Sequence, residues 1–413
     1  MGCGVARWLD VSTSTTLAPL VLRSPTDADW EQTSLLHGVS FGHFEHADTY
    51  DVARSLIADD GAVVVCDDDV VVGMAAYFDF AFTVPGGAVV PMAGLSMVGV
   101  APTHRRRGVL RAMYVELHQR IADAGYPLAG LTASEGGIYG RFGYGPATME
   151  RVLTIDRRFA KFHADAPDPG GARMIRPAEH GDALAAIYDR WRRQTPGGLL
   201  RSQGLWDDLL ADREDDRDGG TALVGILHAD GYVLYRVFGN ETMSVHVEEF
   251  KAVTTDAHVA LTRALLGLDL VETVKIWTYA RDPLPYLLTD SRVARTTKYE
   301  DDLWLRIMDV PTALEARGYQ ADVSTVVEVS DQFAGSGGRF ALDVRDGRAR
   351  CTPTAAAPQV WMDLDALGSL YLGVHQVVPL ATANRVRAND PTVLARLEAA
   401  FLSDVPAHLG FGF

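Results

Sequence analysis

The sequence predicts a protein of the α/β class with several domains. Its 413 residues are 47% apolar, which allows several hydrophobic cores to be buried. Runs rich in β-branched residues alternate with segments of helical periodicity along the chain, a pattern typical of sheets covered by helices. A segment rich in Pro and Gly at 163–177 indicates a boundary after the first such unit. A chain of this length forms roughly two to four domains.

Three apolar runs in the first segment predict neighbouring strands. They cover residues 62–66, 70–80 and 95–100, and Asp and Gly-Gly turns separate them. Gly125 is expected to end the helix that follows, and residues 128–132 form the next strand. The helix itself is indicated by apolar side chains at spacings of three and four, namely Leu110, Met113, Leu117 and Ile121.

Two later segments repeat this alternation. Residues 178–300 contain apolar runs at 222–238 and 244–253 between helical stretches, and residues 303–413 form a third unit. Within that unit the pattern predicts strands at 324–330 and 339–344 and helices at 362–373 and 391–404. We expect residues 1–20 to be a disordered N-terminus before the first domain.

Composition and charge exclude several classes of protein. The net charge of −16 disfavours nucleic-acid binding and is compatible with a cationic substrate. Three widely separated cysteines (Cys3, Cys66 and Cys351) fit neither a disulfide framework nor a zinc site, and we expect no metal. No apolar run is long enough to cross a membrane, and no signal peptide is recognisable. The expected compartment is the cytoplasm, although export without a signal peptide stays open.

The stretch VGVAPTHRRRGVLRAM (98–113) predicts a strand, a tight turn and a helix start. Backbone N–H groups at a helix N-terminus have no partner and attract anions, so a diphosphate is the natural ligand of such a turn. Gly108 would allow phosphate oxygens close to the backbone, and Arg105, Arg106 and Arg107 would add positive charge. The alternative is a solvated basic helix start without a ligand.

The stretch EGGIYGRFGYGP (135–146) combines five glycines with three aromatic rings. Glycine is costly inside regular structure, so this density requires a close approach or a turn. We expect Phe142 and Tyr144 to be core residues. Glycines at 136, 137 and 140 would let the chain pass close to a ligand, and those at 143 and 145 would permit the following turn.

These two stretches resemble the signatures of the GNAT acetyltransferases. Their donor site is a strand followed by Arg/Gln-x-x-Gly-x-Gly/Ala and a helix, and Leu110 here replaces the last small residue. The longer pattern is similar to the Eis (enhanced intracellular survival) family of aminoglycoside N-acetyltransferases from actinobacteria. That resemblance extends through YDRWRRQTPGGLLR, DPLPYLLTD and LWLRIMDVPTALEARGY to the final Phe.

The resemblance implies three domains. An N-terminal GNAT domain (21–165) would be followed by a degenerate GNAT-like domain (166–302) and a sterol carrier protein-like domain (303–413). In the second copy, Thr255 and Asp256 stand where the first has its Arg run and Gly108. Asp256 would repel phosphate and cap the helix, which makes that copy structural. A homohexamer, without nucleic acid or membrane as partner, is also implied.

The resemblance further implies acetyl-CoA as co-substrate and assigns site residues. Tyr139 would be the general acid that protonates the leaving thiolate. The C-terminal carboxylate of Phe413 would be the general base that takes a proton from the acceptor ammonium, with Phe411 and Phe413 holding the end in place. Positions that match the family's acetyl-CoA contacts are Val98, Gly99, Val100, Arg106, Arg107, Gly108, Val109, Leu110, Arg111, Ser134 and Glu135.

The acceptor stays open at this point. Aminoglycoside-like polycations, acetylated on one or several amines and so linked to antibiotic resistance, are the first candidate. Lysine side chains of proteins or peptides are the second. Glu45 and Asp48 are candidate carboxylates of an acidic acceptor pocket, and we assign no metal or catalytic role to histidines such as His118 and His246. A lipid-carrier function of residues 303–413 would require an apolar tunnel there.

Overall fold

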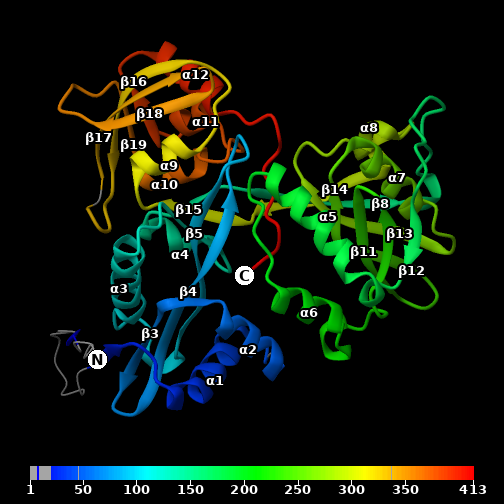
Figure 1. The fold of residues 1–413 in the computed structure, drawn as a ribbon, viewed down its shortest axis with the longest axis horizontal. Helices are drawn as coiled ribbons and strands as arrows, with labels where there is room; N and C mark the ends of the chain where they lie inside the picture. Colours follow the sequence, from blue (N-terminus) through cyan, green and yellow to red (C-terminus); the bar gives the residue numbers. More distant parts are fainter. Residues whose placement is uncertain (1–6, 9–19, 45, 336) are drawn as a thin grey trace.

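The protein is described by a computed structural model, which covers residues 7–8, 20–44, 46–335 and 337–413. Three β-sheets with their helices form three units (Figure 1). The C-terminal segment after the last helix leaves the third unit and runs between the other two, so that the chain ends near the middle of the molecule.

The first sheet has the strand order β1-β2-β3-β4-β5-β6-β15-β7. Alternate side chains of its strands pack on opposite faces. Val63 and Val65 belong to the cluster beneath α3, whereas Val64 and Cys66 belong to a different cluster, which includes Leu36 of α1. The strands are β1 (Arg7–Trp8), β2 (Val21–Arg23), β3 (Ile57–Asp67), β4 (Val70–Thr83), β5 (Val89–Val100), β6 (Leu128–Thr132), β7 (Gly145–Pro146) and β15 (Leu303–Ile307), and the helices are α1 (Trp30–Phe41), α2 (Ala47–Ser55), α3 (Val109–Asp123) and α4 (Gly136–Tyr139).

The second sheet has the order β14-β8-β13-β12-β11-β10-β9 and is covered by α7 on one face and α5 on the other. Its strands are β8 (Met149–Asp156), β9 (Arg173–Ile175), β10 (Val224–His228), β11 (Gly231–Phe238), β12 (Met243–Ala252), β13 (Val271–Tyr279) and β14 (Ala294–Asp301), and its helices are α5 (Gly181–Gln194), α6 (Gln203–Ala211), α7 (Thr255–Leu266) and α8 (Leu284–Leu287).

The third sheet has the order β18-β17-β16-β19-β20. Its strands are β16 (Val323–Ser330), β17 (Gly338–Arg345), β18 (Arg348–Pro353), β19 (Val360–Asp363) and β20 (Val386–Ala388), and its helices are α9 (Val310–Ala316), α10 (Leu364–Leu370), α11 (Val377–Thr382) and α12 (Pro391–Phe401). The strands and helices predicted from sequence in this unit are all present.

Sheet membership differs from the expected boundaries at 165 and 303. Strand β8 belongs to the second sheet, where it pairs with β13 and β14. Strand β15 pairs antiparallel with β6, with Leu303 opposite Thr132, and so completes the first sheet. The second unit is therefore inserted between β7 and β15. Propensity and periodicity are local and carry no information on which sheet a strand joins.

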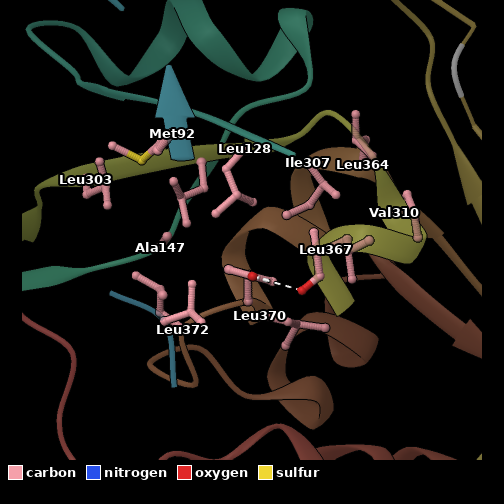
Figure 2. Close-up of a cluster of buried hydrophobic side chains, with 14 of the residues drawn as sticks. Met92, Leu128, Ala147, Leu303, Ile307, Val310, Leu364, Leu367, Leu370 and Leu372 are labelled. Atoms are coloured by element: carbon pink, nitrogen blue, oxygen red, sulfur yellow. Dashed lines mark hydrogen bonds between the residues drawn. The ribbon is translucent and has the colours of Figure 1, made fainter. Parts of the chain in front are cut away.

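One hydrophobic core joins the first and third units. Met92 and Leu128 of the first sheet contact the same cluster as Leu367 and Leu370 of α10 (Figure 2). A buried ion pair lies beside it, in which Arg306 of β15 donates to Asp331 at 2.6 Å. Such a shared core fixes these two units relative to each other.

The N-terminal region is described only in part. Arg7–Trp8 forms a short strand that pairs with Val21–Arg23, which differs from the expected disorder of that dipeptide. The rest of 1–19, including Cys3, lies outside the described residues. Cys66 and Cys351 are buried free thiols. Among the helices that the structure describes, none is long and apolar enough to span a membrane. The same part of the chain contains no cluster of three or more metal-ligating side chains.

Candidate active site

A cleft opens where two parallel strands of the first sheet separate. Strands β5 and β6 pair only from Met92 opposite Leu128 to Gly94 opposite Gly130. Beyond these pairs the strands diverge, and neither has the other as a hydrogen-bonding partner there. The exposed edges leave backbone N–H and C=O groups for a ligand to bind, because such groups require partners when buried.

A β-bulge lies at the same place in β5. Its register with β4 shifts between Met74 opposite Gly99 and Ala76 opposite Ser96, and Met97 adopts a positive φ of 55°. The extra residue bends the strand away from β6 and turns backbone groups toward the cleft. Bulges of this kind commonly occur next to active sites.

The cleft has a volume of about 410 Å³. Four predicted site residues line it, namely Val98 of β5, Ser134, Tyr139 and Phe413. The remaining lining residues come from α1 and the segment that follows it, from β5, from α3 and from the end of β6: His37, Phe41, His43, Leu95, Ser96, Met97, Tyr114, Leu131, Thr132 and Ala133.

Tyr139 is the last residue of the short helix α4, and only 8% of its surface is exposed. Burial raises the pKa of its phenol, and a hydrogen bond with Ser134 partly opposes that shift. The phenol therefore keeps its proton at neutral pH, as a proton donor must. Tyr144 is fully buried and hydrogen-bonds His118 at 2.9 Å, and Phe142 stacks on Tyr114, so both aromatic residues are part of the core as predicted.

Phe413 reaches the cleft from the far end of the chain. The hydroxyl of Thr132 donates a hydrogen bond of 2.9 Å to its terminal oxygen. Its ring packs against Phe80 at a centroid distance of 4.8 Å, and Phe411 packs against the same ring. The half-buried end of the chain is thus held by both its ring and its carboxyl group.

The predicted phosphate-binding turn lies between β5 and α3. Gly108 precedes α3 as its N-cap with a φ of 81°, and a Cβ there would meet no atom within 4 Å. Arg106 also has a positive φ, of 63°, and is exposed. Turns that contain residues of positive φ can direct successive backbone N–H groups to one side, which favours an anion. No side chain caps α3, so its first N–H groups are available.

The other predicted donor-binding residues have mixed environments. Arg107 already forms an ion pair of 3.8 Å with Asp67, and Arg111 lies 4.9 Å above the ring of Phe333 in the third unit. Val109 is buried beneath the helix, so only its backbone can contact a ligand. Val100 and Leu110 are half-buried, and Glu135 is exposed beside Ser134.

For some of the glycines, the structure gives a different reason for the missing side chain than the sequence predicted. A Cβ at Gly99 would lie 2.7 Å from Ser40 of α1, so this glycine permits close helix packing. A Cβ at Gly145 would collide with the carbonyl of Asp365, because α10 of the third unit approaches there. Gly143 supplies the expected turn, with a φ of 82°. Gly137 and Gly140 face open space, where a ligand can approach.

The sequence did not identify the α1 wall of the cleft. The ring of His37 packs against that of Phe41 at a centroid distance of 4.6 Å and contacts Tyr50, and His43 follows the helix. The spacing of four between His37 and Phe41 would have placed them on one helix face. The role of Thr132 could not be predicted from the sequence either, because its hydrogen-bond partner, Phe413, is distant along the chain.

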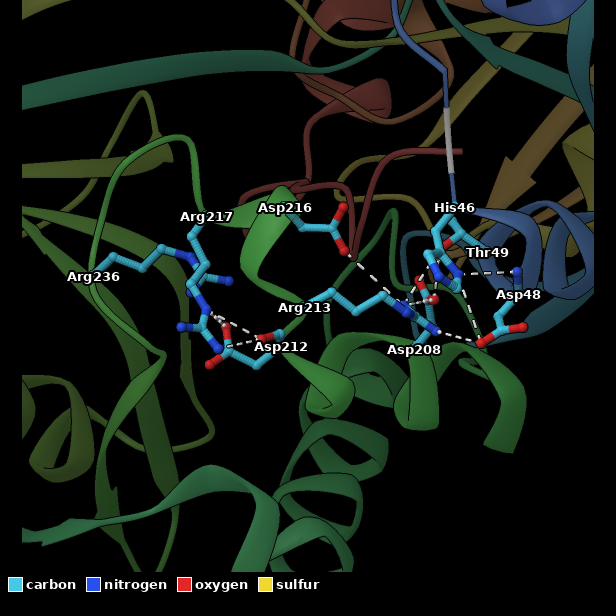
Figure 3. Close-up of polar contacts among 9 residues, drawn as sticks. All are labelled: His46, Asp48, Thr49, Asp208, Asp212, Arg213, Asp216, Arg217 and Arg236. Atoms are coloured by element: carbon cyan, nitrogen blue, oxygen red, sulfur yellow. Dashed lines mark hydrogen bonds and ion pairs between the residues drawn. The ribbon is translucent and has the colours of Figure 1, made fainter. Parts of the chain in front are cut away.

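Of the two candidate carboxylates for an acceptor pocket, the structure describes one. Glu45 lies outside the described residues. Asp48 of α2 is exposed and lies 3.8 Å from Arg213 of the second unit, in a polar network that also includes His46 and Asp208 (Figure 3). Asp48 is not among the residues that line the cleft.

Two expectations concern the second and third units. Helix α7 is capped by Thr254, whose side chain accepts from the N–H of Ala257, so the cap is not Asp256 as expected. Asp256 lies in the first turn instead. In the third unit, the apolar cavity around Leu314 and Phe401 has a volume of about 10 Å³, far too small for an acyl chain.

Comparisons with known proteins agree with this architecture. Models of the acetyltransferase (GNAT) domain match residues 21–147 and 197–307, and a model of the sterol carrier protein domain matches residues 310–410. The predicted order of two GNAT-like domains and a sterol-carrier-like domain is thereby confirmed.

Similar proteins are known at full length. N-acetyltransferase Eis of Mycobacterium tuberculosis (strain ATCC 25177 / H37Ra) is 57% identical over 405 residues, which cover 95% of this chain and 100% of that protein. An uncharacterized N-acetyltransferase of Streptomyces avermitilis is 37% identical and covers 90% of this chain and 94% of its own length. The crystal structure of Eis1 from Mycobacterium abscessus matches with a TM-score of 0.85 at 31% identity, over 95% of this chain and 100% of that one.

Proposed function

The chain belongs to the Eis family of GNAT N-acetyltransferases, and on this premise we propose that it transfers acetyl groups from acetyl-CoA to several amines of aminoglycoside-like polycations. Tyr139 is the general acid and the C-terminal carboxylate of Phe413 is the general base. The observation that carries the proposal is that both residues line the same cleft, at the point where β5 and β6 diverge.

The two residues would handle the two protons of the reaction. The carboxylate of Phe413 takes a proton from the acceptor ammonium, which frees the amine to attack the thioester carbonyl. As the amide bond forms and the carbon–sulfur bond breaks, the phenol of Tyr139 gives its proton to the leaving sulfur, and the resulting phenolate takes the second proton that the nitrogen loses as it becomes an amide. The hydrogen bond from Thr132 orients the carboxylate, and contact with Ser134 orients the phenol.

The turn before α3 suits the phosphates of the donor. Arg106 and Gly108 provide outward N–H groups, and the N-terminus of α3 adds a positive dipole. The unpaired edge of β5 at Val98 would bind the amide groups of the pantetheine arm by adding to the strand. These donor groups lie on α3 and β5, whereas Phe413 comes from the third unit, so donor and base occupy different walls of the cleft.

The acceptor class is tested directly by mass spectrometry. Purified protein is incubated with acetyl-CoA and a panel of aminoglycosides in one set of reactions. A second set contains acetyl-CoA and a panel of lysine peptides. Each acetyl group adds 42 Da to the acceptor. We expect several such increments on the aminoglycosides. Acetylation of peptides alone would replace the proposed substrate class by the lysine acetyltransferase alternative.

We also infer a homohexamer from the family resemblance. Light scattering coupled to size-exclusion chromatography measures this directly, with an expected mass of six times the 44.8 kDa chain. A monomer or dimer at micromolar concentration would contradict the inference without affecting the proposed chemistry.

A further inference from the structure

The second sheet repeats the cleft geometry of the first. Strands β12 and β13 are parallel and pair only as far as Val247 opposite Ile276. The register of β12 with β11 shifts where Tyr235 lies opposite Val247 and Leu234 lies opposite Glu249, which makes Glu248 the extra residue of a bulge. Helix α7 then follows β12 as α3 follows β5. Two diverging parallel strands, a bulge and a following helix are therefore present in both units.

The C-terminal segment of the chain occupies this second opening. Two cavities lie there, of about 120 and 410 Å³, and residues 405–406 and 408–412 contribute to their walls together with the diverging ends of β12 and β13. Phe250 and Trp277 line both cavities. Figure 1 shows the same segment running between the first and second units before it ends.

Specific contacts hold the segment in place. Lys251 of β12 donates a hydrogen bond of 2.9 Å to the carbonyl of Gly410. On the other side, the N–H groups of His408 and Gly410 donate to the carbonyls of Pro196 and Gly197 at 2.9 and 3.2 Å. Gly197 has a φ of 94°, and a Cβ there would lie 2.7 Å from the carbonyl oxygen of His408.

The charged groups around this contact are buried. Only 4% of Lys251 is exposed, and its ammonium lies 4.2 Å above the ring of Trp191. Its neighbour Glu249 is paired with Arg201, whose guanidinium lies 5.0 Å from the ring of Phe411. A lysine buried this deeply requires an acceptor, and the C-terminal segment supplies one in the carbonyl of Gly410.

We propose that the donor cleft of the second GNAT unit is a binding site for the protein's own C-terminal segment, and that it positions the Phe413 carboxylate in the first unit's cleft. A nucleotide donor is disfavoured in this cleft because Thr254 caps α7 and Asp256 adds negative charge at its N-terminus. Lys251 is thus a positioning residue, and the duplicated domain serves the active site of its neighbour. The positioning step rests on the proposed role of Phe413, whereas the docking step does not.

The docking step is tested with carboxypeptidase on the intact protein. The rate at which Phe413 is released is followed by intact-mass spectrometry for the wild type and for Lys251→Met, which removes the donor but keeps the length of the side chain. Release should be roughly tenfold faster in the variant, the effect of losing one charge-assisted hydrogen bond. Lys275→Met is the matched control, since Lys275 lies on the paired part of β13, away from the segment.

A second variant acts from the segment itself. A Cβ at Gly410 would lie 2.3 Å from the hydroxyl of Tyr188, so Gly410→Ala should displace the segment without changing the cleft. Equal release rates for the wild type and both variants, with melting temperatures showing that they are folded, would overturn the docking inference.

Activity of the same variants separates docking from chemistry. Lys251→Met should lower kcat roughly tenfold and leave the KM for acetyl-CoA unchanged, because the donor groups lie on other elements. A lower kcat with an unchanged release rate would overturn the inference. Faster release with an unchanged kcat would support docking and instead remove Phe413 from the proposed mechanism.

Discussion

The hydroxyl of Thr132 donates a hydrogen bond of 2.9 Å to the terminal oxygen of Phe413, although 281 positions separate the two residues. Thr132 ends β6, the strand that forms one wall of the cleft, and Phe413 is the last residue of the chain. The contact therefore holds the C-terminus against the end of β6, where the proposed general base is needed.

Replacing Thr132 by Val tests this contact, since it removes the hydroxyl and keeps the shape. The hydrogen bond orients the carboxylate, so its loss should lower kcat roughly tenfold, as expected for a bond to a charged group. Steady-state kinetics measures this change. Thr154→Val is the control, because Thr154 pairs with Thr297 far from the cleft. A kcat equal to that of the wild type would separate Thr132 from catalysis.

Replacing Tyr139 by Phe should leave acetyl-CoA binding intact and lower kcat about 100-fold, the low end for a lost general acid. Tyr144→Phe is the matched control. It removes a phenol that hydrogen-bonds His118 in the core, so it should lower the melting temperature and change kcat little. Steady-state kinetics, donor titration and thermal unfolding give the three quantities. Wild-type turnover in Tyr139→Phe would assign the proton to water or to another group.

Replacing Gly108 by Asp tests the phosphate turn. The substitution places a carboxylate at the N-terminus of α3 and strains a residue with φ of 81°, so the KM for acetyl-CoA should rise by at least tenfold. Gly125→Asp at the other end of α3 is closely matched, since Gly125 also has a positive φ, of 78°, and an added Cβ there would meet no atom within 4 Å. Equal donor affinity in the two variants would mean that the phosphates bind elsewhere.

The local parts of this site could be predicted from the sequence because local patterns determine them. The periodicity of Leu110, Met113 and Leu117 predicted α3, and the apolar runs predicted β5 and β6. The bulge at Met97 could not be predicted, because it depends on the register between two strands. The same holds for β15, whose place between β6 and β7 is a long-range pairing that the local pattern does not encode.

Glycine 145 shows why a correct motif can carry an incomplete explanation. The density of neighbouring glycines predicted a turn at Gly145, but the bare backbone at this position is required by Asp365 and Ser369 of α10. A single sequence shows that a side chain is absent and does not show which element fills the space. The His37 wall was missed for a related reason, since a histidine on a helix face has many structural roles.

Replacing Glu150 by Gln should change how stability depends on pH. Burial, together with the carboxylates of Asp302 and Glu300, raises the pKa of Glu150 from 4.5 to about 7, against the opposing effect of Lys298 and Lys251. In the window from 4.5 to 7 the folded protein then binds more protons than the unfolded chain, so the free energy of unfolding decreases as pH rises.

The destabilisation by ionised Glu150 is complete above pH 7 and absent below pH 4.5. Glu150→Gln removes it, so the melting temperature of the variant should exceed that of the wild type at about pH 8, with a smaller difference at about pH 5. Glu179→Gln, at an exposed position, should show no such pH-dependent difference. A variant that is less stable than the wild type at the higher pH would show that Glu150 has a compensating partner.

Deleting Phe413, or extending the chain beyond it, tests the general base directly. Deletion moves the carboxylate to Gly412 and removes a ring that packs against Phe80, whereas a short C-terminal tag keeps the ring and replaces the carboxylate by a peptide bond. Both changes should abolish turnover, because the acceptor ammonium then has no base beside it. Acetyl-CoA binding and oligomeric state should not change, since the donor groups lie on α3 and β5. The same tag at the N-terminus is the control for bulk and charge. Full activity in the C-terminally tagged protein would show that the base is another group, and residual activity in the deletion but not in the tagged protein would show that any carboxylate at the chain end suffices.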